Sequence, residues 1–481
     1  MVLLAPGGRT PGAKATVKTS VVLLAALLAS GAASAAPQKH LLVDGTTTVA
    51  SSNLMTVLGT VTKSPRNPLF GEEYPWEPRL DNVYPNVVWD RAKQLYRCWY
   101  TPFTVWQLDE KASTPQISRT RYREAGVCYA ESADGLTWRK PLLAEFPFHG
   151  QPSNVVLPLA ADAGVLWDRH DSDPARRFKL LYRPETDGKL GPLATGFSPD
   201  GLHWTAGRSL GLTLQADTHN NAIWAPTLHR YVVLTRDWKP AAADKTKRVR
   251  WVARTESPDF VRWAPAEKIL GGLDDHHQVY SMPIFYYAGV YLGLPTIYED
   301  LTDRTHVELT WSKDTVHWQR VNPGQALIGN SPQPGAYDWG CVYASVPVFE
   351  SGRIAVYYGG SAGIHTGPRK SFLALATFRP DGFAGVTPAD STQPGKLVTT
   401  RLIADGAAGI SLSADIEAGG SIQAVLVDAT TNREVAHFAP ITGAAQLSDA
   451  ALRRVDGEIP AGRSVRLKFE MSRAVLYSFA L

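Results

Sequence analysis

Short runs of apolar and aromatic residues recur along the chain, separated by segments rich in Gly, Asp and Pro. The runs have the length and β-branched or aromatic content of strands, and no stretch shows helical periodicity. The pattern therefore predicts an all-β chain. The strongest runs are Tyr96–Tyr100, Phe178–Tyr182, Tyr231–Thr235, Val290–Leu294 and Ile354–Gly360.

A turn motif follows each of these runs. Ser132-Ala-Asp-Gly-Leu-Thr-Trp138 returns almost unchanged at 198–204, and the copies at 257–263 and 312–318 keep its Ser, Asp and Trp. A fifth, degraded copy, Arg379-Pro-Asp-Gly-Phe383, keeps the Asp-Gly pair. An Asp followed by Gly suits a tight turn, because Asp bonds nearby backbone amides and Gly accepts a positive φ. The spacing marks a structural repeat.

Several strands per unit and five units predict a five-bladed β-propeller over residues 40–386. An irregular all-β sandwich whose turns share Asp-Gly is the alternative. The apolar run His40–Asp44 is expected to be a strand that completes the last blade, since rings of this kind close without a free edge. After a turn-rich linker at 389–395 the composition changes, and 396–481 are predicted to form a C-terminal β-sandwich that is structural and does not contact substrate.

The N-terminal segment has the pattern of a secretory signal. Arg9, Lys14 and Lys18 precede the apolar run Val21–Leu28, and Ala33-Ser-Ala35 supplies small residues for cleavage. A signal peptide at 1–35 predicts a secreted or periplasmic protein, with a retained membrane anchor as the alternative. No other long apolar stretch is present, so no membrane association is expected after cleavage.

Charge and cysteine content narrow the function classes. Loss of residues 1–35 removes three basic and no acidic groups, which lowers the net charge from +4 to about +1. With no basic run among aromatics, nucleic acid is not an expected partner. Cys98, Cys128 and Cys341 lack the spacing of a zinc site and are expected to be buried free thiols, with a Cys98–Cys128 bridge as the alternative. A monomer without cofactor or catalytic metal is predicted.

Acidic residues stand at corresponding places in the strands predicted to line the propeller channel. Asp81, Asp217, Asp275 and Asp338 begin four of these segments and are expected to converge on one funnel, whereas 151–157 in the second unit carries Asn154 there. Converging carboxylates raise one another's pKa, and such a pair suits acid/base cleavage of a glycosidic bond. The alternatives are a structural cation in the channel, or aspartates that cap strand starts.

The candidate residues fall into two groups. The catalytic candidates are Asp81 and Asp217, with Asp275 and Glu299 assisting. Polar and flat aromatic side chains nearby are expected to bind sugar hydroxyls and ring faces. These substrate-binding candidates are Trp76, Asn154, His219, Asn220, His277, Asp338 and Trp339.

The repeated turns and channel aspartates resemble the five-bladed propeller enzymes of glycoside hydrolase families 32 and 43. The resemblance implies three carboxylates, acting as nucleophile or base, stabiliser and acid, on the first three blades. Asp81 matches the first position, Asn154 stands at the second, and Asp217 stands at the third, where the family has Glu. The family's Asp-Pro-Asn-Gly, Arg-Asp-Pro and Glu-Cys signatures are absent, so standard fructosidase or arabinofuranosidase activity is not implied. The segments that carry the likeness are Tyr74–Glu77, Val87–Asp90, Tyr96–Tyr100, Asp217–Asn221 and Ala474–Phe479.

Three hypotheses follow. The first is a secreted glycoside hydrolase that cleaves a poly- or oligosaccharide with Asp81 and Asp217 as its main pair. The second is a non-catalytic carbohydrate-binding propeller. The third is a lyase or another hydrolase that uses His219 or His277 on the same scaffold.

Overall fold

The computed structural model describes residues 38–43, 45–104, 124–148, 150–186, 189–205, 207–404 and 409–481. These residues form strands, turns and two single-turn 3-10 helices, η1 (Gly45–Thr47) and η2 (Pro174–Arg176). The described residues contain no α-helix, so the all-β prediction is confirmed. Within the same ranges no helix has the length and apolarity needed to span a membrane. The predicted signal peptide lies outside the described residues.

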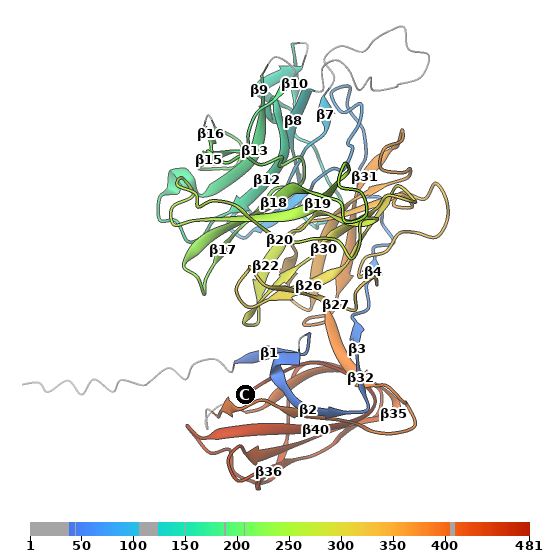
Figure 1. The fold of residues 1–481 in the computed structure, drawn as a ribbon. Coiled ribbons are helices and arrows are strands. Elements are labelled where there is room, and N and C mark those ends of the chain that lie inside the picture. Colours follow the sequence, from blue (N-terminus) through green and yellow to red (C-terminus); the bar gives the residue numbers. More distant parts are fainter. Residues whose placement is uncertain are drawn as a thin grey trace, which may run out of the picture. The chain divides into compact units, whose positions relative to one another are not determined.

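Antiparallel sheets follow one another along the chain (Figure 1). The first sheet has the order β11-β8-β6-β5, with β7 on β8 and a separate hairpin of β9 and β10. The strands of the sheet are β5 (Asn86–Asp90), β6 (Leu95–Tyr100), β7 (Phe103–Thr104), β8 (Glu124–Ser132) and β11 (Val155–Pro158), and those of the hairpin are β9 (Leu143–Phe148) and β10 (Gln151–Ser153). The second sheet comprises β12 (Ala160–Trp167), β13 (Phe178–Thr186), β14 (Lys189–Leu190), β15 (Ala194–Ser198) and β16 (Arg208–Ser209).

The next sheets repeat this plan. The third contains β17 (Asn221–Ala225), β18 (Arg230–Pro240), β19 (Arg248–Ser257) and β20 (Glu267–Leu270). The fourth contains β22 (Ile284–Tyr287), β23 (Val290–Gly293), β26 (Leu309–Ser312) and β27 (Trp318–Val321), beside a smaller sheet of β21 (His277–Ser281), β24 (Thr296–Glu299) and β25 (Arg304–Val307). The fifth contains β28 (Cys341–Ala344), β29 (Val348–Glu350), β30 (Arg353–Ser361), β31 (Ser371–Phe378) and β4 (Thr62–Lys63).

The repeated turn fixes each sheet to its neighbour. In the four well-kept copies the Asp carboxylate accepts two backbone N–H groups of its own turn, as Asp134 does from Leu136 (2.8 Å) and Thr137 (2.7 Å). A side chain from the preceding sheet, or from η2 in one case, then donates to the turn. The first turn receives its donor from the fifth sheet, so the contacts run in a cycle. The donors and turn residues are Tyr357 with Gly135, Arg97 with Asp200, Arg176 with Asp259, Arg254 with Thr315 and Tyr287 with Asp381.

The first strands of these sheets line a shared cavity. β5 borders β12, β12 borders β17, β17 borders β22, and β29 borders β5. Together they surround a cavity of about 390 Å³. In the second sheet the channel-side strand is therefore β12, and not the predicted segment 151–157. That prediction was wrong because Val155–Pro158 pairs with β8 as the outer strand of the first sheet.

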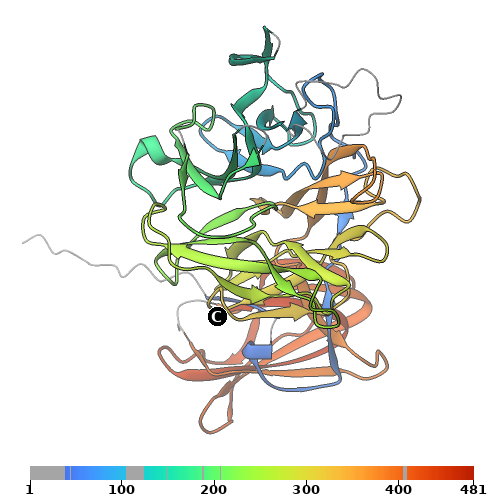
Figure 2. The same ribbon diagram turned by 45° about the horizontal axis from the view of Figure 1, so that its top comes forward.

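A separate, large sheet holds the C-terminal part of the chain together with its first strands (Figure 1), and Figure 2 gives a second view of this grouping. Its core is made of residues such as Leu412, Leu426, Leu467 and Phe469. The strands are β1 (Lys39–Leu41), β2 (Thr48–Ser52), β3 (Leu54–Leu58), β32 (Ala384–Pro388), β33 (Gly395–Thr399), β34 (Leu402–Ile403), β35 (Ser411–Asp428), β36 (Glu434–Phe438), β37 (Ile441–Thr442), β38 (Ala445–Ala451), β39 (Arg454–Gly457) and β40 (Ser464–Ala480).

The strand predicted to complete the last blade belongs to this C-terminal sheet. His40 pairs with Phe479 of β40, and their rings stack at 5.1 Å. Leu42 is buried in the C-terminal core, which draws the segment away from the fifth sheet. Thr62 and Lys63 pair with β31 instead. The prediction was right that an N-terminal strand is added to this sheet, and wrong about which one.

The three cysteines are buried free thiols, as expected. Cys98 lies on β6 and Cys128 on the neighbouring β8, but their partners across the pair are Ala130 and Tyr100. Burial raises the pKa of both thiols, which keeps them protonated.

Candidate active site

Three aspartates meet near the beginnings of the channel-side strands. Asp81 precedes β5, Asp162 lies on β12, and Asp217 precedes β17. The backbone is left-handed at each place, with φ of +52° at Asp81, +59° at Asp162 and +48° at Ala216. The β-branched Val83 has φ of +62°, a conformation that is strained for its side chain. Such strain concentrates at functional sites, where the surrounding structure holds it in place.

A bulge in β12 presents Asp162. The register of β12 against β13 shifts between Ala161 and Gly164. A Cβ atom on Gly164 would lie 1.5 Å from the carbonyl oxygen of Asn220, so only glycine fits this approach of the third sheet. The Asn220 side-chain amide in turn donates to the Asp162 carbonyl at 2.8 Å. The neighbouring sheet therefore positions the bulge and its carboxyl group.

Asp162 is only 8% exposed, and its Oδ2 accepts no hydrogen bond from a described residue. Burial raises its pKa well above the ordinary range, and the carboxylates of Asp217 and Asp81 raise it further. Arg183 and Arg236 act in the opposite direction, Arg183 from 3.6 Å. The balance keeps a proton on Asp162 at a pH where an ordinary aspartate is charged.

The other two carboxylates are paired with arginines. The Asp217 side chain is 59% exposed, and its Oδ2 lies 2.6 Å from Nη2 of Arg236, which is buried. Asp81 Oδ1 lies 2.6 Å from Arg79 and 2.8 Å from the fully buried Arg369. The site thus contains one carboxyl group that retains a proton beside two carboxylates in ion pairs.

Buried tyrosines fill the space between these charges. Tyr84, Tyr280, Tyr298 and Tyr343 form a cluster with Cys341. The Asn82 amide donates to Tyr84 Oη at 2.8 Å and to Tyr280 Oη at 3.3 Å. Burial raises the pKa of Tyr84 and Tyr343 well above its ordinary value, so both remain neutral phenols.

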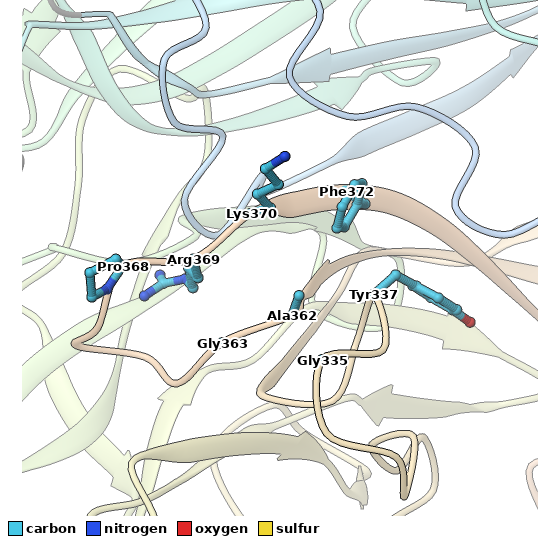
Figure 3. Close-up of a pocket in the computed structure, with 8 residues that line it drawn as sticks. All are labelled: Gly335, Tyr337, Ala362, Gly363, Pro368, Arg369, Lys370 and Phe372. Carbon is cyan, nitrogen blue, oxygen red and sulfur yellow. The ribbon is translucent and has the colours of Figure 1, made fainter. Parts of the chain in front are cut away.

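A cavity of about 370 Å³ lies next to Arg369 (Figure 3). Arg369, which pairs with Asp81, is one of its lining residues. The others are Gly335, Tyr337, Ala362, Gly363, Pro368, Lys370 and Phe372. The cavity is therefore connected to the carboxylate cluster through Arg369, whose side chain is buried.

Asp275 and Asp338 do not join this cluster, so the predicted convergence of four aspartates was wrong. Asp275 accepts the backbone N–H groups of Ala242 and Ala243 at an exposed loop. Asp338 has a fully buried side chain 2.6 Å from Nζ of Lys63, on the strand that completes the fifth sheet. Both act as structural acceptors, which is the strand-capping alternative.

Several predicted sugar contacts are in the core. Trp76 and Asn154 are 5% and 0% exposed, and Trp76 Nε1 donates to Asn154 Oδ1 at 2.7 Å. Trp339 is half-buried, with the Arg304 guanidinium 4.9 Å from its ring centre. The Trp76 ring and the Asn154 amide group cannot contact a sugar, because other side chains cover them.

The histidine and amide candidates have structural partners. His219 is 1% exposed, bonds Asn86 Oδ1 at 3.0 Å through Nε2, and has a pKa lowered by burial to about 3. Asn220 is fully buried and bonds main-chain carbonyls. The exposed His277 pairs with Asp274, and Glu299 pairs with His306 at 3.0 Å. None of the bonds of these side chains involves the carboxyl group of Asp162, and Asn220 contacts only its main-chain carbonyl.

Sequence reasoning missed Asp162 and three buried or half-buried arginines, Arg236, Arg250 and Arg369. One signal in the sequence could have revealed Asp162. Val165-Leu-Trp-Asp168 repeats Val87-Val-Trp-Asp90, and aligning them identifies β12 as the channel-side strand. The arginines carry no sequence motif. Among the described residues no cluster of three or more His, Cys, Asp or Glu side chains is arranged to hold a metal ion.

No protein-family model matches the sequence, and no curated protein matches it. Solved structures do resemble it. A glycosyl hydrolase from Bacteroides ovatus is 12% identical, with a TM-score of 0.42 over 66% of this chain and 94% of that one. A family 43 arabinoxylan arabinofuranohydrolase from Bacillus subtilis is 11% identical, with a TM-score of 0.41 over 86% and 96%. A structure from a study of GH130 enzymes that target β-1,2 mannosidic linkages in Candida mannan is 12% identical, with a TM-score of 0.44 over 66% and 94%. At this level the likeness carries no argument about activity.

Proposed function

We propose that this protein is a secreted glycoside hydrolase, built as a five-bladed β-propeller followed by a C-terminal β-sandwich. The observation that carries the activity is Asp162, a buried carboxyl group with a raised pKa, close to the ion-paired carboxylates of Asp81 and Asp217. Acid/base cleavage of a glycosidic bond uses one protonated and one ionised carboxyl group. Strands from successive sheets around one cavity support the propeller.

The catalytic role of each aspartate follows from its burial and its charged neighbours. Asp162 is the proton donor to the leaving oxygen, because burial and its two acidic neighbours hold its proton. Asp217 is exposed and forms an ion pair with Arg236, which suits the base or nucleophile. Asp81, held between Arg79 and Arg369, stabilises positive charge that develops on the sugar ring. The sequence pattern alone favoured Asp217 as the acid.

The test is hydrolysis of a polysaccharide panel by wild type and Asp162→Asn. The amide keeps the shape but has no proton to transfer, so turnover should fall by about 10²- to 10⁴-fold. Asp244→Asn is the matched control, because Asp244 lies on the exposed loop between β18 and β19 and bonds only Thr246. Equal turnover in wild type and Asp162→Asn would remove Asp162 from the mechanism.

One observation favours a second function, a non-catalytic carbohydrate-binding propeller. Each of the three carboxylates has an arginine within ion-pair distance, which is also how a structural network neutralises its acids. If wild type binds a saccharide in calorimetry but releases no reducing ends from any member of the panel, this function replaces the hydrolase.

A further inference from the structure

Five arginines surround the carboxylate cluster, and four of them are paired. Arg79 and Arg369 contact Asp81, Arg183 contacts Asp162, and Arg236 contacts Asp217. The fifth, Arg250 on β19, makes no ion pair with any described residue. The cluster therefore contains more guanidinium groups than its carboxylates neutralise.

Arg250 is held without a counterion. Its guanidinium carbon lies 4.5 Å from the ring centre of Tyr298, 4.9 Å from Trp238 and 5.2 Å from Tyr280. Nη1 donates to the Gln278 side chain at 2.9 Å, and Nε has no hydrogen-bond partner among the described residues. Arg236 packs on the same Tyr280 ring at 4.9 Å and leaves Nε and Nη1 without partners. A partly desolvated cation with unused donors is costly unless an anion binds it.

The cavity of about 370 Å³ next to Arg369 adds a further cationic side chain, that of Lys370. Two of its lining residues, Arg369 and Lys370, are cationic, and none is acidic. Lys370 is exposed, and its side chain makes no ion pair with a described residue. In Figure 3 the Lys370 side chain extends away from that of Arg369. A ligand in this cavity would therefore meet a positive charge that Asp81 does not neutralise.

We propose that the ligand of this site is an anionic saccharide, and that Arg250 and Lys370 bind its carboxylate or sulfate groups. The inference rests on the proposed function for the saccharide, and on the unpaired cations for its charge. Guanidinium groups bind planar oxyanions through paired N–H donors, and such charge-assisted bonds are stronger than neutral ones. Arg250 and Lys370 are specificity-determining residues in this arrangement, while proton transfer stays with Asp162.

The first experiment is calorimetry with wild type and three oligosaccharides of equal length: an oligogalacturonate, a sulfated galactan fragment and a neutral xylo-oligosaccharide. At least one anionic ligand should bind more than about tenfold more tightly than the neutral one, and lose affinity as salt rises, because ions screen exposed charges. Comparison of the two anionic ligands identifies carboxylate or sulfate as the bound group. Neutral binding as tight as anionic binding, or binding of inorganic sulfate alone, would overturn the proposal.

The second experiment compares Arg250→Gln and Lys370→Gln with Arg262→Gln, a charge-matched control on an outer turn. Each of the first two variants should bind the anionic ligand about 10- to 100-fold more weakly than wild type does, and should bind the neutral ligand with unchanged affinity. Arg262→Gln should leave both unchanged. Lys370 is exposed, so its variant keeps the test open if Arg250→Gln does not fold. Equal weakening of charged and neutral ligands would overturn the specificity role.

Binding is measured without turnover, so the two proposals can fail separately. Tight anionic binding with no cleavage of any saccharide supports the inference and removes the hydrolase. Cleavage of a neutral polysaccharide without binding of any anionic saccharide supports the hydrolase and overturns the inference of an anionic ligand.

Discussion

The outer turns and the central cluster both contain aspartates, yet Asp134 of the first turn and Asp162 of the cluster have opposite pKa shifts. In the first turn, backbone N–H groups of Thr137 and Leu136 lower the pKa of Asp134 to about 2. In the cluster, burial raises the pKa of Asp162 well above the ordinary range. Amide dipoles stabilise a carboxylate, whereas desolvation penalises it. The position of an aspartate, and not its recurrence, therefore decides whether it supports the architecture or the chemistry.

The fifth turn shows that a shift of one position along the chain changes the role of the turn aspartate. In the four regular turns the left-handed residue is the third after the strand, namely Gly135, Gly201, Phe260 and Thr315. After β31 the third residue is Asp381 itself, with φ of +62°. The apparent fifth motif is thus shifted by one position, and its Asp occupies the glycine site of the others. Its buried carboxylate binds Lys39, Ser413 and Ser478 of the C-terminal sheet region, and Tyr287 of β22.

The largest expected effect is that of Asp381→Ala. The change leaves Lys39 without its buried partner and three hydroxyl groups without an acceptor, which should cost about 3–5 kcal/mol. Asp314→Ala, in a regular turn, removes hydrogen bonds from two backbone N–H groups and contacts with Ser312 and His317, all near solvent, and should cost about 1 kcal/mol. Urea unfolding of both variants measures the difference. Equal losses would mean that the fifth turn is not distinguished by its register.

Asp162→Asn should have a smaller effect on stability, and in the opposite direction. A group whose folded pKa is raised contributes stability below its unfolded pKa and loses it as pH rises through the folded value. The neutral amide does not lose it, so the variant should become more stable relative to wild type as pH rises above the unfolded pKa of about 3.9, by roughly 1 to 3 °C in Tm. Scanning calorimetry at several pH values tests this. A Tm difference that stays constant with pH would show that Asp162 has an ordinary pKa.

The sequence predicted the fold well where the signal was local. Strand runs such as Phe178–Tyr182 and the Asp-Gly turns depend on alternation and on turn chemistry within a few residues, and both are present in the structure. The prediction from sequence failed where the pairing of strands depends on burial against residues far away in the chain. Which N-terminal segment pairs with β31 depends on Leu42 being buried in a core built mostly from residues after 396, and no local pattern carries that information.

The site was predictable only in part. Asp81 and Asp217 were found because they begin channel-side segments, whereas Asp162 was missed through a shift in one strand assignment. Asp338 was placed at the site by its phase, but Lys63 pairs with it in the core. The charge of the ligand depends on which arginines lack partners, and only three-dimensional pairing reveals that for Arg250.

The smallest expected effect is in the first outer turn, and its pH dependence is the reverse of that of Asp162. The folded pKa of Asp134 is lowered to about 2, so its contribution is present above the unfolded pKa of about 3.9 and is lost as pH falls toward 2. Asp134 is exposed, so solvent screening limits the loss in Asp134→Asn to about 1 °C at pH 7, and it should vanish near pH 2. Ser132→Ala is the comparison variant. It removes the 2.9 Å acceptor of the Gly135 N–H at any pH, and it also removes the hydroxyl that donates to Asp134 at 2.9 Å. Thermal unfolding from pH 7 to pH 2 should therefore show the Asp134→Asn deficit closing while part of the Ser132→Ala deficit persists. A deficit at Asp134 that persists at pH 2 would show that it does not arise from the charge of this carboxylate.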